Sequence, residues 1–173
     1  MTGRILPREA WLLWTALWAG AATGLLFMFA PVLLAGTPLE WMGDCLFSAY
    51  APFCHQEADR SFHVRGVQLV ACSRCVALYA GTLLGVTIAP ALGIVGRTRL
   101  LPRWVLAAGL LPLVVDALAG LWGLGDSSFA SRTATGILAG AAGSLFVLPA
   151  AAGAFRDIRA KLFHKEVLAC HPE

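Results

Sequence analysis

Residues 10–39 read AWLLWTALWAGAATGLLFMFAPVLLAGTPL and contain no charged side chain. The core of this run, residues 11–36, exceeds the roughly 7 to 15 apolar residues of a cleaved secretion signal and is long enough to cross a bilayer. We therefore predict a transmembrane helix over residues 10–36. The run is typical of the whole chain of 173 residues, of which 58% are hydrophobic and 13% charged. This composition excludes an ordinary soluble enzyme.

Three further apolar stretches of spanning length follow, at residues 67–95, 100–124 and 133–155. Their prolines do not argue against helices, because membrane helices tolerate proline when neighbouring groups satisfy the freed backbone atoms. We predict an all-α integral membrane four-helix bundle that forms a single domain over residues 1–173. The net charge of +3 does not indicate nucleic acid, since the basic residues stand between apolar runs. The expected partner is the lipid bilayer.

Lysine and arginine are distributed unevenly about these four stretches. The basic residues before the first stretch, between the second and third and after the fourth are Arg4, Arg8, Arg97, Arg99, Arg103, Arg156, Arg159, Lys161 and Lys165, whereas the opposite side has Arg60, Arg65 and Arg132. Cytoplasmic loops carry the excess of positive charge. We therefore predict a multi-pass protein of the inner (cytoplasmic) membrane, with both termini cytoplasmic, an outer loop at residues 37–66 and a cytoplasmic tail at residues 156–173.

The outer loop is polar but contains aromatic and apolar residues throughout. They are Trp41, Met42, Leu46, Phe47, Tyr50 and Phe53. This mixture suits an amphipathic segment that lies at the bilayer surface or folds back over the mouth of the bundle.

Three cysteines and a histidine fall on the extracytoplasmic side of this arrangement. Cys72 and Cys75 form a C-x-x-C motif near the start of the second helix, a spacing that places both sulfur atoms on one helical face. Cys54 is followed by His55 in a loop that can fold over this helix. Three thiolates and one imidazole form a tetrahedral ligand set typical of zinc. We predict a metal site, with zinc as the ion, formed by Cys54, His55, Cys72 and Cys75.

The identity of the fourth ligand and the purpose of the metal stay open. Two adjacent residues, such as Cys54 and His55, bind the same ion only with an unusual backbone conformation. His55 could instead lie outside the coordination sphere and support one of the ligands, with His63 as the fourth ligand. The metal could be structural and hold the loop over the bundle. It could also be catalytic, with an open coordination position that activates water.

A thiol-disulfide oxidoreductase is the second interpretation of the same cysteines. The extracytoplasmic side is oxidising, and a C-x-x-C motif at a helix N-terminus has a lowered thiol pKa. With Cys45 and Cys54 in the loop, the arrangement is similar to quinone-linked thiol oxidoreductases of the vitamin K epoxide reductase and disulfide-bond-protein-B kind. That likeness is architectural, and it implies a quinone as cofactor. A transporter or assembly factor without chemistry is the third interpretation.

Two ionisable residues fall inside the predicted helices, where such groups usually have a function. Arg74 and Asp116 each lie eight residues from the outer end of their helix, about 12 Å at about 1.5 Å per residue. We predict an ion pair between them beneath the cysteines, with Arg132 as the alternative partner of Asp116. The candidates for acting on a substrate are Gln56, Arg60, Arg74, Asp116 and Arg132. Among these, Gln56, Arg60 and Arg74 would orient an anionic or lipid-borne molecule.

Glycines spaced four residues apart occur at Gly81 and Gly85 and again at Gly136 and Gly140. Small residues at this spacing permit close helix contact. We interpret them as packing surfaces inside the bundle, and a homodimer through these glycine-lined faces is the alternative. The oligomeric state does not follow from the sequence.

Residues 53–85, FCHQEADRSFHVRGVQLVACSRCVALYAGTLLG, resemble domain-of-unknown-function family 2085, a group of small predicted prokaryotic membrane proteins. The matching residues are Cys54, His55, Gln56, Arg60, Ser61, Phe62, Gly66, Cys72, Arg74, Cys75, Tyr79, Gly81 and Gly85, with Asp116, Arg132, Thr135 and Gly136 further along. The resemblance implies a membrane location and a shared site, without an activity. Val76 departs from the small residue expected there. Cys45 lies outside the pattern, which favours the metal site over a redox scheme with two cysteine pairs.

Overall fold

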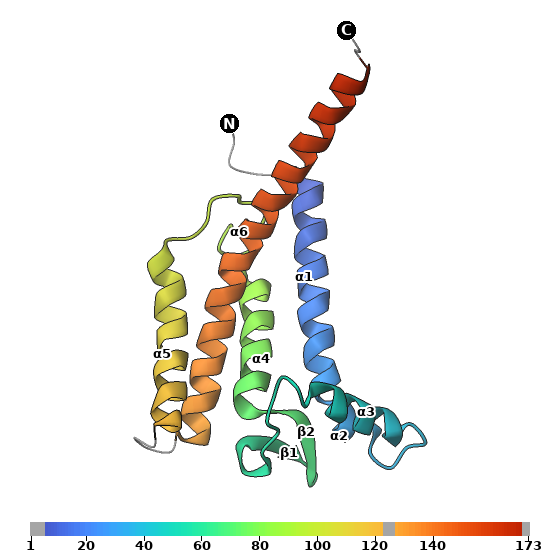
Figure 1. The fold of residues 1–173 in the computed structure, drawn as a ribbon, viewed down its shortest axis with the longest axis vertical. Coiled ribbons are helices and arrows are strands. Elements are labelled where there is room, and N and C mark those ends of the chain that lie inside the picture. Colours follow the sequence, from blue (N-terminus) through green and yellow to red (C-terminus); the bar gives the residue numbers. More distant parts are fainter. Residues whose placement is uncertain (1–5, 123–126, 171–173) are drawn as a thin grey trace.

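The computed structural model describes residues 6–122 and 127–170, and for residues 7 and 163–170 it describes the backbone alone (Figure 1). The predicted helix end at residues 123–124 and residues 171–173 of the predicted tail lie outside the described residues. The elements in chain order are α1 (Pro7–Met28), α2 (Ala30–Leu34), α3 (Glu40–Tyr50), the 3-10 turn η1 (Ala58–Arg60), β1 (Ser61–Val64), β2 (Val67–Cys72), α4 (Ser73–Ile88), α5 (Arg103–Leu121) and α6 (Phe129–Cys170).

Three of the described helices are long and apolar enough to cross a membrane. They are Arg8–Met28 in α1, Arg103–Leu121 in α5 and Phe129–Leu162 in α6, with mean hydropathies of 1.4, 2.0 and 1.8. In the apolar windows of α1 and α5 only 6% of the residues are buried. Their apolar side chains therefore face outward, as contact with lipid requires.

The predicted helix at residues 67–95 is wrong at both ends. β2 occupies Val67–Cys72, and α4 contains only 16 residues, a length of about 24 Å against about 30 Å of hydrocarbon core. A short apolar run fits a strand as well as a helix, so the sequence did not distinguish them. The fold is mostly helical but includes a two-stranded sheet, and four full-length crossings are not confirmed.

α4 ends at Ile88 because Pro90 follows. Proline has no N–H, so the carbonyl of Val86, four residues earlier, loses its helical donor. The indole Nε1 of Trp14 in α1 donates to this carbonyl instead, at 2.8 Å. One hydrogen bond therefore satisfies the freed backbone group and joins α1 to α4.

The strands β1 and β2 form an antiparallel hairpin within and just after the predicted outer loop. Arg65 and Gly66 connect them with φ values of 53° and 81°. Both values are positive, as a two-residue type I′ turn requires. The register pairs Ser61 with Cys72, so the hairpin returns the chain to the start of α4 with Cys72 at the junction.

The predicted outer loop also contains a helix, α3, that covers one end of the bundle (Figure 1). Leu46, Phe47 and Tyr50 pack against a buried cluster that includes Met28 and Leu69. On the same helix Trp41 is 60% exposed. α3 therefore covers the core with one side and presents an aromatic side chain outward, in agreement with the amphipathic segment expected there.

α4 and α6 are in close contact through the four glycines singled out in the sequence. A Cβ at Gly81 would overlap the carbonyl oxygen of Ile137, and one at Gly140 would overlap that of Leu78. A Cβ at Gly136 would lie 2.8 Å from the carbonyl oxygen of Arg74. The packing interpretation is confirmed. These faces are occupied within one chain, and formation of a dimer stays an untested prediction.

Two other predicted boundaries differ from the structure. The first helix, expected over residues 10–36, ends at Met28, and α2 follows with Pro31 in its first turn. The fourth, expected over residues 133–155, begins at Phe129 and continues through the predicted tail to Cys170. Figure 1 shows both termini toward one end of the molecule and α2, α3 and the hairpin at the other.

Candidate metal centre

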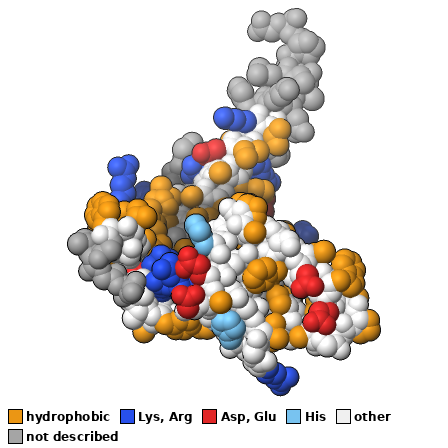
Figure 2. Space-filling view, turned by 60° about the horizontal axis from the view of Figure 1, so that its bottom comes forward, with side chains coloured by type: hydrophobic (Ala, Val, Ile, Leu, Met, Phe, Trp, Pro, Cys, Tyr) orange, Lys and Arg blue, Asp and Glu red, His pale blue; other side chains and the backbone are white. Residues whose placement is uncertain are grey.

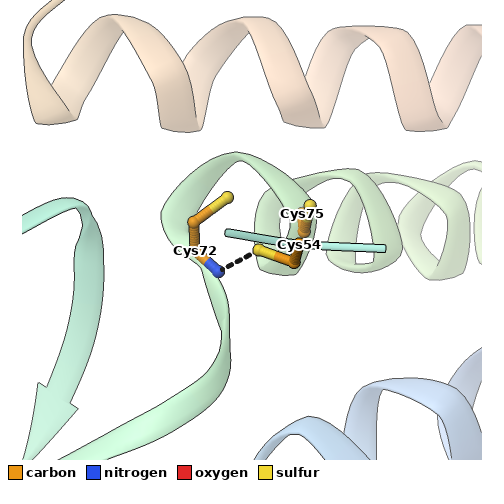
Figure 3. Close-up of side chains that lie close together, drawn as sticks. All are labelled: Cys54, Cys72 and Cys75. Carbon is orange, nitrogen blue, oxygen red and sulfur yellow. Dashed lines mark hydrogen bonds between the residues drawn. The ribbon is translucent and has the colours of Figure 1, made fainter. Parts of the chain in front are cut away.

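The sulfur atoms of Cys54, Cys72 and Cys75 all lie within 4.8 Å of one another (Figure 3). Cys72 ends β2 and is the N-cap of α4, and Cys75 lies in the first turn of α4. The strand-to-helix junction therefore brings the two sulfurs of the C-x-x-C motif together. Only Cys75 belongs to the helix, whereas the sequence placed both cysteines inside it.

Cys54 reaches this junction from the end of α3. Its backbone N–H donates to the carbonyl of Tyr50 at 3.0 Å, which extends the last turn of α3, and the residue is 6% exposed. The backbone N–H of Cys72 donates to Cys54 Sγ at 3.2 Å, the dashed line in Figure 3. This contact orients the sulfur of Cys54 toward the C-x-x-C motif.

Gln56 fixes the loop that follows Cys54. Its φ is 52°, and its side-chain Nε2 donates to the carbonyls of Phe47 at 2.6 Å and Val70 at 2.7 Å. Gln68 Nε2 in turn donates to the carbonyl of Gln56 at 2.7 Å. Gln56, predicted as a substrate-orienting residue, therefore ties α3 to β2. The role of Gln68 in this tie was not predicted.

The histidines predicted as ligands lie outside the sulfur group. His55 is exposed, and within the described residues its ring does not join the three sulfurs at mutual distances of 4.8 Å. His63 lies on β1, with Nδ1 3.1 Å from the carbonyl oxygen of Ser61, and is also outside the group. His55 lines the cavity described next, so its ligation of a metal stays a prediction.

A cavity of about 450 Å³ lies beside the sulfur group, and all three cysteines line it. Its ionisable lining also includes His55, Glu57, Arg60, Arg74 and Arg132. One wall comes from Ala117, Gly120 and Leu121 of α5. Figure 2, which brings this end of the molecule forward, shows arginine or lysine side chains against acidic ones near a histidine. Soft metal ligands and guanidinium groups therefore share one cavity.

The predicted ion pair between Arg74 and Asp116 is confirmed, since Arg74 Nη2 donates to Asp116 Oδ2. The Asp116 side chain is 10% exposed and that of Arg74 29%. Ser131 Oγ donates to the other carboxylate oxygen, Oδ1, at 2.8 Å. Arg74 reaches Asp116 from the first turn of α4, not from eight residues inside a helix as predicted.

Arg132 has a different partner from the one considered in the sequence. Its Nε donates to Ser127 Oγ at 2.6 Å, and Arg74 Nη2 lies 3.4 Å from the same oxygen. Ser127 therefore connects two guanidinium groups that line the cavity. Ser127 and Ser131 were missed in the sequence, because serine is common in loops and at helix starts and signals no particular chemistry there.

A hydrogen bond from the Cys75 thiol lowers the pKa of Cys72 to about 5. Backbone donors from Cys75 and Arg74 and the Cys54 side chain lower it as well, while burial acts in the opposite direction. Cys72 is therefore a thiolate at neutral pH. Thiolate is the form that binds metals and attacks disulfides.

Cys45 lies on α3, exposed and outside the sulfur group. Cys45, Cys54, Cys72 and Cys75 are free thiols in the described part of the chain. The two pairs of cysteines required by the redox interpretation are therefore not brought together by the described fold.

Comparison with known proteins places this site within a family. A family model described as a predicted membrane protein, domain-of-unknown-function family 2085, matches residues 54–146. An uncharacterized protein of Methanocaldococcus jannaschii is 34% identical over 110 residues, which cover 64% of this chain and 70% of that protein. No solved structure is significantly similar to the chain. The matched residues include the three clustered cysteines, Arg60, Arg74, Asp116 and Arg132.

Proposed function

Because this chain belongs to domain-of-unknown-function family 2085 of predicted membrane proteins, we propose that it is a membrane metalloprotein. Cys54, Cys72 and Cys75 are the proposed protein ligands, and zinc is the proposed ion. The site lies at one end of the helices, at the junction of α3, β2 and α4.

The observation that carries this proposal is the mutual distance of the three sulfur atoms, at most 4.8 Å. Zinc binds thiolates at about 2.3 Å, so tetrahedral geometry separates two sulfurs by about 3.8 Å. Closing the group around an ion therefore requires movements on the order of 1 Å, within the range of side-chain rotation. Thiolate donors select zinc over magnesium or calcium, which prefer oxygen ligands.

In this proposal the fourth coordination position is filled either by His55 or by water. The His55 ring lies outside the sulfur group but lines the same cavity. Three protein ligands and an open position that accepts water are typical of catalytic zinc, whereas a fourth protein ligand is typical of structural zinc. His55→Ala separates them, since loss of a ligand lowers zinc affinity by orders of magnitude and loss of a cavity residue leaves it nearly unchanged.

The charge distribution supports an extracytoplasmic location for the site. Nine basic residues flank the helices on the side of the termini and four, including Arg74, lie on the side of the cysteines. Cytoplasmic segments carry the excess of positive charge. We therefore place both termini in the cytoplasm and the sulfur group at the outer face of a cytoplasmic membrane.

A quinone-linked thiol oxidoreductase is the competing function, and the same geometry gives it support. Three free thiols within 4.8 Å could exchange disulfide partners. Cys45 would have to approach this group to form the second pair. The two functions differ in the oxidation state of the cysteines, which makes a direct experiment possible.

The experiment is a count of maleimide-reactive thiols in a Cys45→Ser/Cys170→Ser protein, which retains only the three clustered cysteines. The metalloprotein function predicts reduced thiols that resist labelling until a chelator is added, after which all three react. The oxidoreductase function predicts one reactive thiol, with two more released by a reductant and none by a chelator. Three thiols that react at once without a chelator would contradict both.

A further inference from the structure

The cavity beside the sulfur group contains three arginines from separate parts of the chain. Arg60 comes from η1, Arg74 from the first turn of α4 and Arg132 from the first turn of α6. Guanidinium groups present planar pairs of N–H donors that match the oxygens of phosphate and carboxylate groups. Three of them around one cavity indicate an anionic ligand.

The carboxylates of the described residues do not satisfy all of these donors. Glu57 pairs with Arg60 at 2.8 Å, but both side chains are more than 40% exposed, and exposed pairs contribute little free energy. Asp116 binds Arg74 through Nη2. Arg132 has no carboxylate partner among the described residues, and its Nε donates to the Ser127 hydroxyl.

Arg74 has a second feature that points to a missing acceptor. Its Nε is buried and has no hydrogen-bond partner within the described part of the chain. Leaving a buried charged donor unsatisfied is costly, so such an atom calls for an explanation. The atom is closed to solvent, so an oxyanion in the cavity would reach it only through a shift of the Arg74 side chain.

The hydrogen-bond network holds two of these arginines, Arg74 and Arg132, in place before a ligand arrives. Asp116 fixes Arg74 from α5, and Ser127 contacts both Arg74 and Arg132. Fixing the donors in advance reduces the entropy that binding would otherwise cost. At these two positions the site therefore does not depend on side chains that order on binding.

Part of the exposed lining of the cavity is apolar. Phe53 and Leu121 line it and are 84% and 77% exposed, although both are large hydrophobic residues. Leu121 is the last residue of α5, one of the candidate membrane-spanning helices. Exposed apolar residues beside a group of arginines suit a molecule that has an anionic head and a hydrocarbon part.

We propose that the cavity binds an oxyanion of the phosphate type, carried by a membrane lipid, with Arg60, Arg74 and Arg132 as the donors. This inference rests on the proposed metalloprotein function for its location beside the sulfur group. Free phosphate has the same head-group chemistry, and the experiment therefore includes it as a separate probe.

The test is a binding titration with purified protein in a zwitterionic detergent. The probes are a short-chain phosphatidic acid, the diacylglycerol with the same two chains, and inorganic phosphate. The variants are Arg132→Gln and Arg60→Gln, with Arg99→Gln as a matched control that removes an exposed arginine outside the cavity. Metal content and gel-filtration behaviour are measured on every sample.

We expect phosphatidic acid to bind at least about tenfold more tightly than diacylglycerol, because a charge-assisted hydrogen bond contributes about that factor. Arg132→Gln and Arg60→Gln should each lose most of this difference, and Arg99→Gln should retain it. If inorganic phosphate binds as tightly as phosphatidic acid, the proposal that a lipid carries the oxyanion is overturned. Equal binding of phosphatidic acid and diacylglycerol, or full binding by both cavity variants, would overturn the oxyanion site.

The same samples separate this inference from the metal proposal. Arginine-dependent binding by protein without metal would support the oxyanion site and contradict the metalloprotein function. Protein that retains metal but does not discriminate between the two lipids would support the metalloprotein function and contradict the oxyanion site. Should Arg132→Gln fail to fold, Arg60→Gln still decides, because the Arg60 side chain is 47% exposed.

Discussion

The guanidinium of Arg74 donates through Nη2 to Oδ2 of Asp116, an ion pair that joins the first turn of α4 to α5. Within the bundle, α5 packs mainly against α6 and not against α4. The ion pair therefore links two helices that otherwise form separate walls of the cavity. Asp116 thereby holds Arg74, one of the cavity arginines, in position.

Removing one member of this pair should destabilise the protein. Asp116→Asn leaves the Arg74 charge without its partner in a largely buried position, which costs about 3 kcal/mol. The exchanged double variant, Arg74→Asp with Asp116→Arg, should recover part of that loss. Thermal unfolding in detergent measures both effects.

The matched control for this pair is Arg156→Gln, which breaks an exposed ion pair with Asp157. Surface pairs contribute about 0 to 1 kcal/mol, so this variant should unfold close to the wild-type temperature. An exchanged double variant no more stable than either single variant would show that the charge interaction between Arg74 and Asp116 does not matter.

Gly140→Ala should destabilise the α4–α6 contact. The added Cβ would overlap the carbonyl oxygen of Leu78 and lie 2.8 Å from the backbone nitrogen of Thr82. Neither backbone atom can move without shifting α4, and such overpacking costs about 1 to 3 kcal/mol. The unfolding temperature should therefore fall.

Gly143→Ala is the control for Gly140→Ala, three residues along the same helix. Among the described residues, a Cβ at Gly143 meets no atom of a neighbouring element within 4 Å. Since alanine favours helix over glycine by roughly 0.5 to 1 kcal/mol, this variant should be as stable as the wild type or slightly more so. Equal unfolding temperatures for the two variants would mean that α4 and α6 do not approach as closely as described.

The reactivity of Cys72 should depend little on pH between about 6.5 and 8.5 after the protein is treated with a chelator. The hydrogen bond from Cys75 holds the pKa of Cys72 at about 5, well below its usual range, so the thiol is already ionised across this window. A thiol of ordinary pKa, about 8.5, loses roughly tenfold in rate per pH unit below that value. Iodoacetamide labelling followed by peptide mass spectrometry measures the profile.

Cys75→Ala removes the largest contribution to the lowered pKa of Cys72. Its pKa should rise toward the ordinary value, and labelling of Cys72 should become strongly pH-dependent. If the labelling rate of Cys72 in the wild-type protein already changes tenfold per pH unit in this window, the lowered pKa is contradicted.

The proposed orientation predicts which residues a membrane-impermeant maleimide reaches in intact cells. Cys45 on α3 is exposed at the end of the molecule proposed to face outward, so it should be labelled directly. A cysteine introduced as Arg99→Cys in a Cys45→Ser/Cys170→Ser background should react only after the cells are permeabilised. The reverse pattern would show that the chain is inverted.

Part of this fold could be predicted from local sequence patterns. The charge-free run at residues 10–39 and the long apolar runs of α5 and α6 predict membrane helices, because no other class of protein needs such composition. The strand at Val67–Cys72 could not be predicted, since its pairing depends on β1 and on the turn at Arg65 and Gly66. An apolar hexapeptide leading into a helix contains no signal for that partner.

The candidate site was predicted in its chemistry and only partly in its geometry. The spacing of Cys72 and Cys75 and the isolated charge of Arg74 identified residues that line one cavity. The isolated charge of Asp116 identified the partner of Arg74, which does not itself line the cavity. The loop that positions Cys54 depends on side-chain to backbone bonds of Gln56 and Gln68, which no spacing rule anticipates. The cavity itself arises from packing of distant elements and is invisible in the sequence.

The most direct test of the central claim is elemental analysis of tag-free protein, with free thiols counted on the same sample. The account predicts about one zinc per chain in the wild type and in Cys45→Ser, reduced thiols in both, and loss of the metal in Cys54→Ser and Cys72→Ser. A wild-type protein without metal, with two or four thiols oxidised, would contradict the account and favour thiol-disulfide exchange.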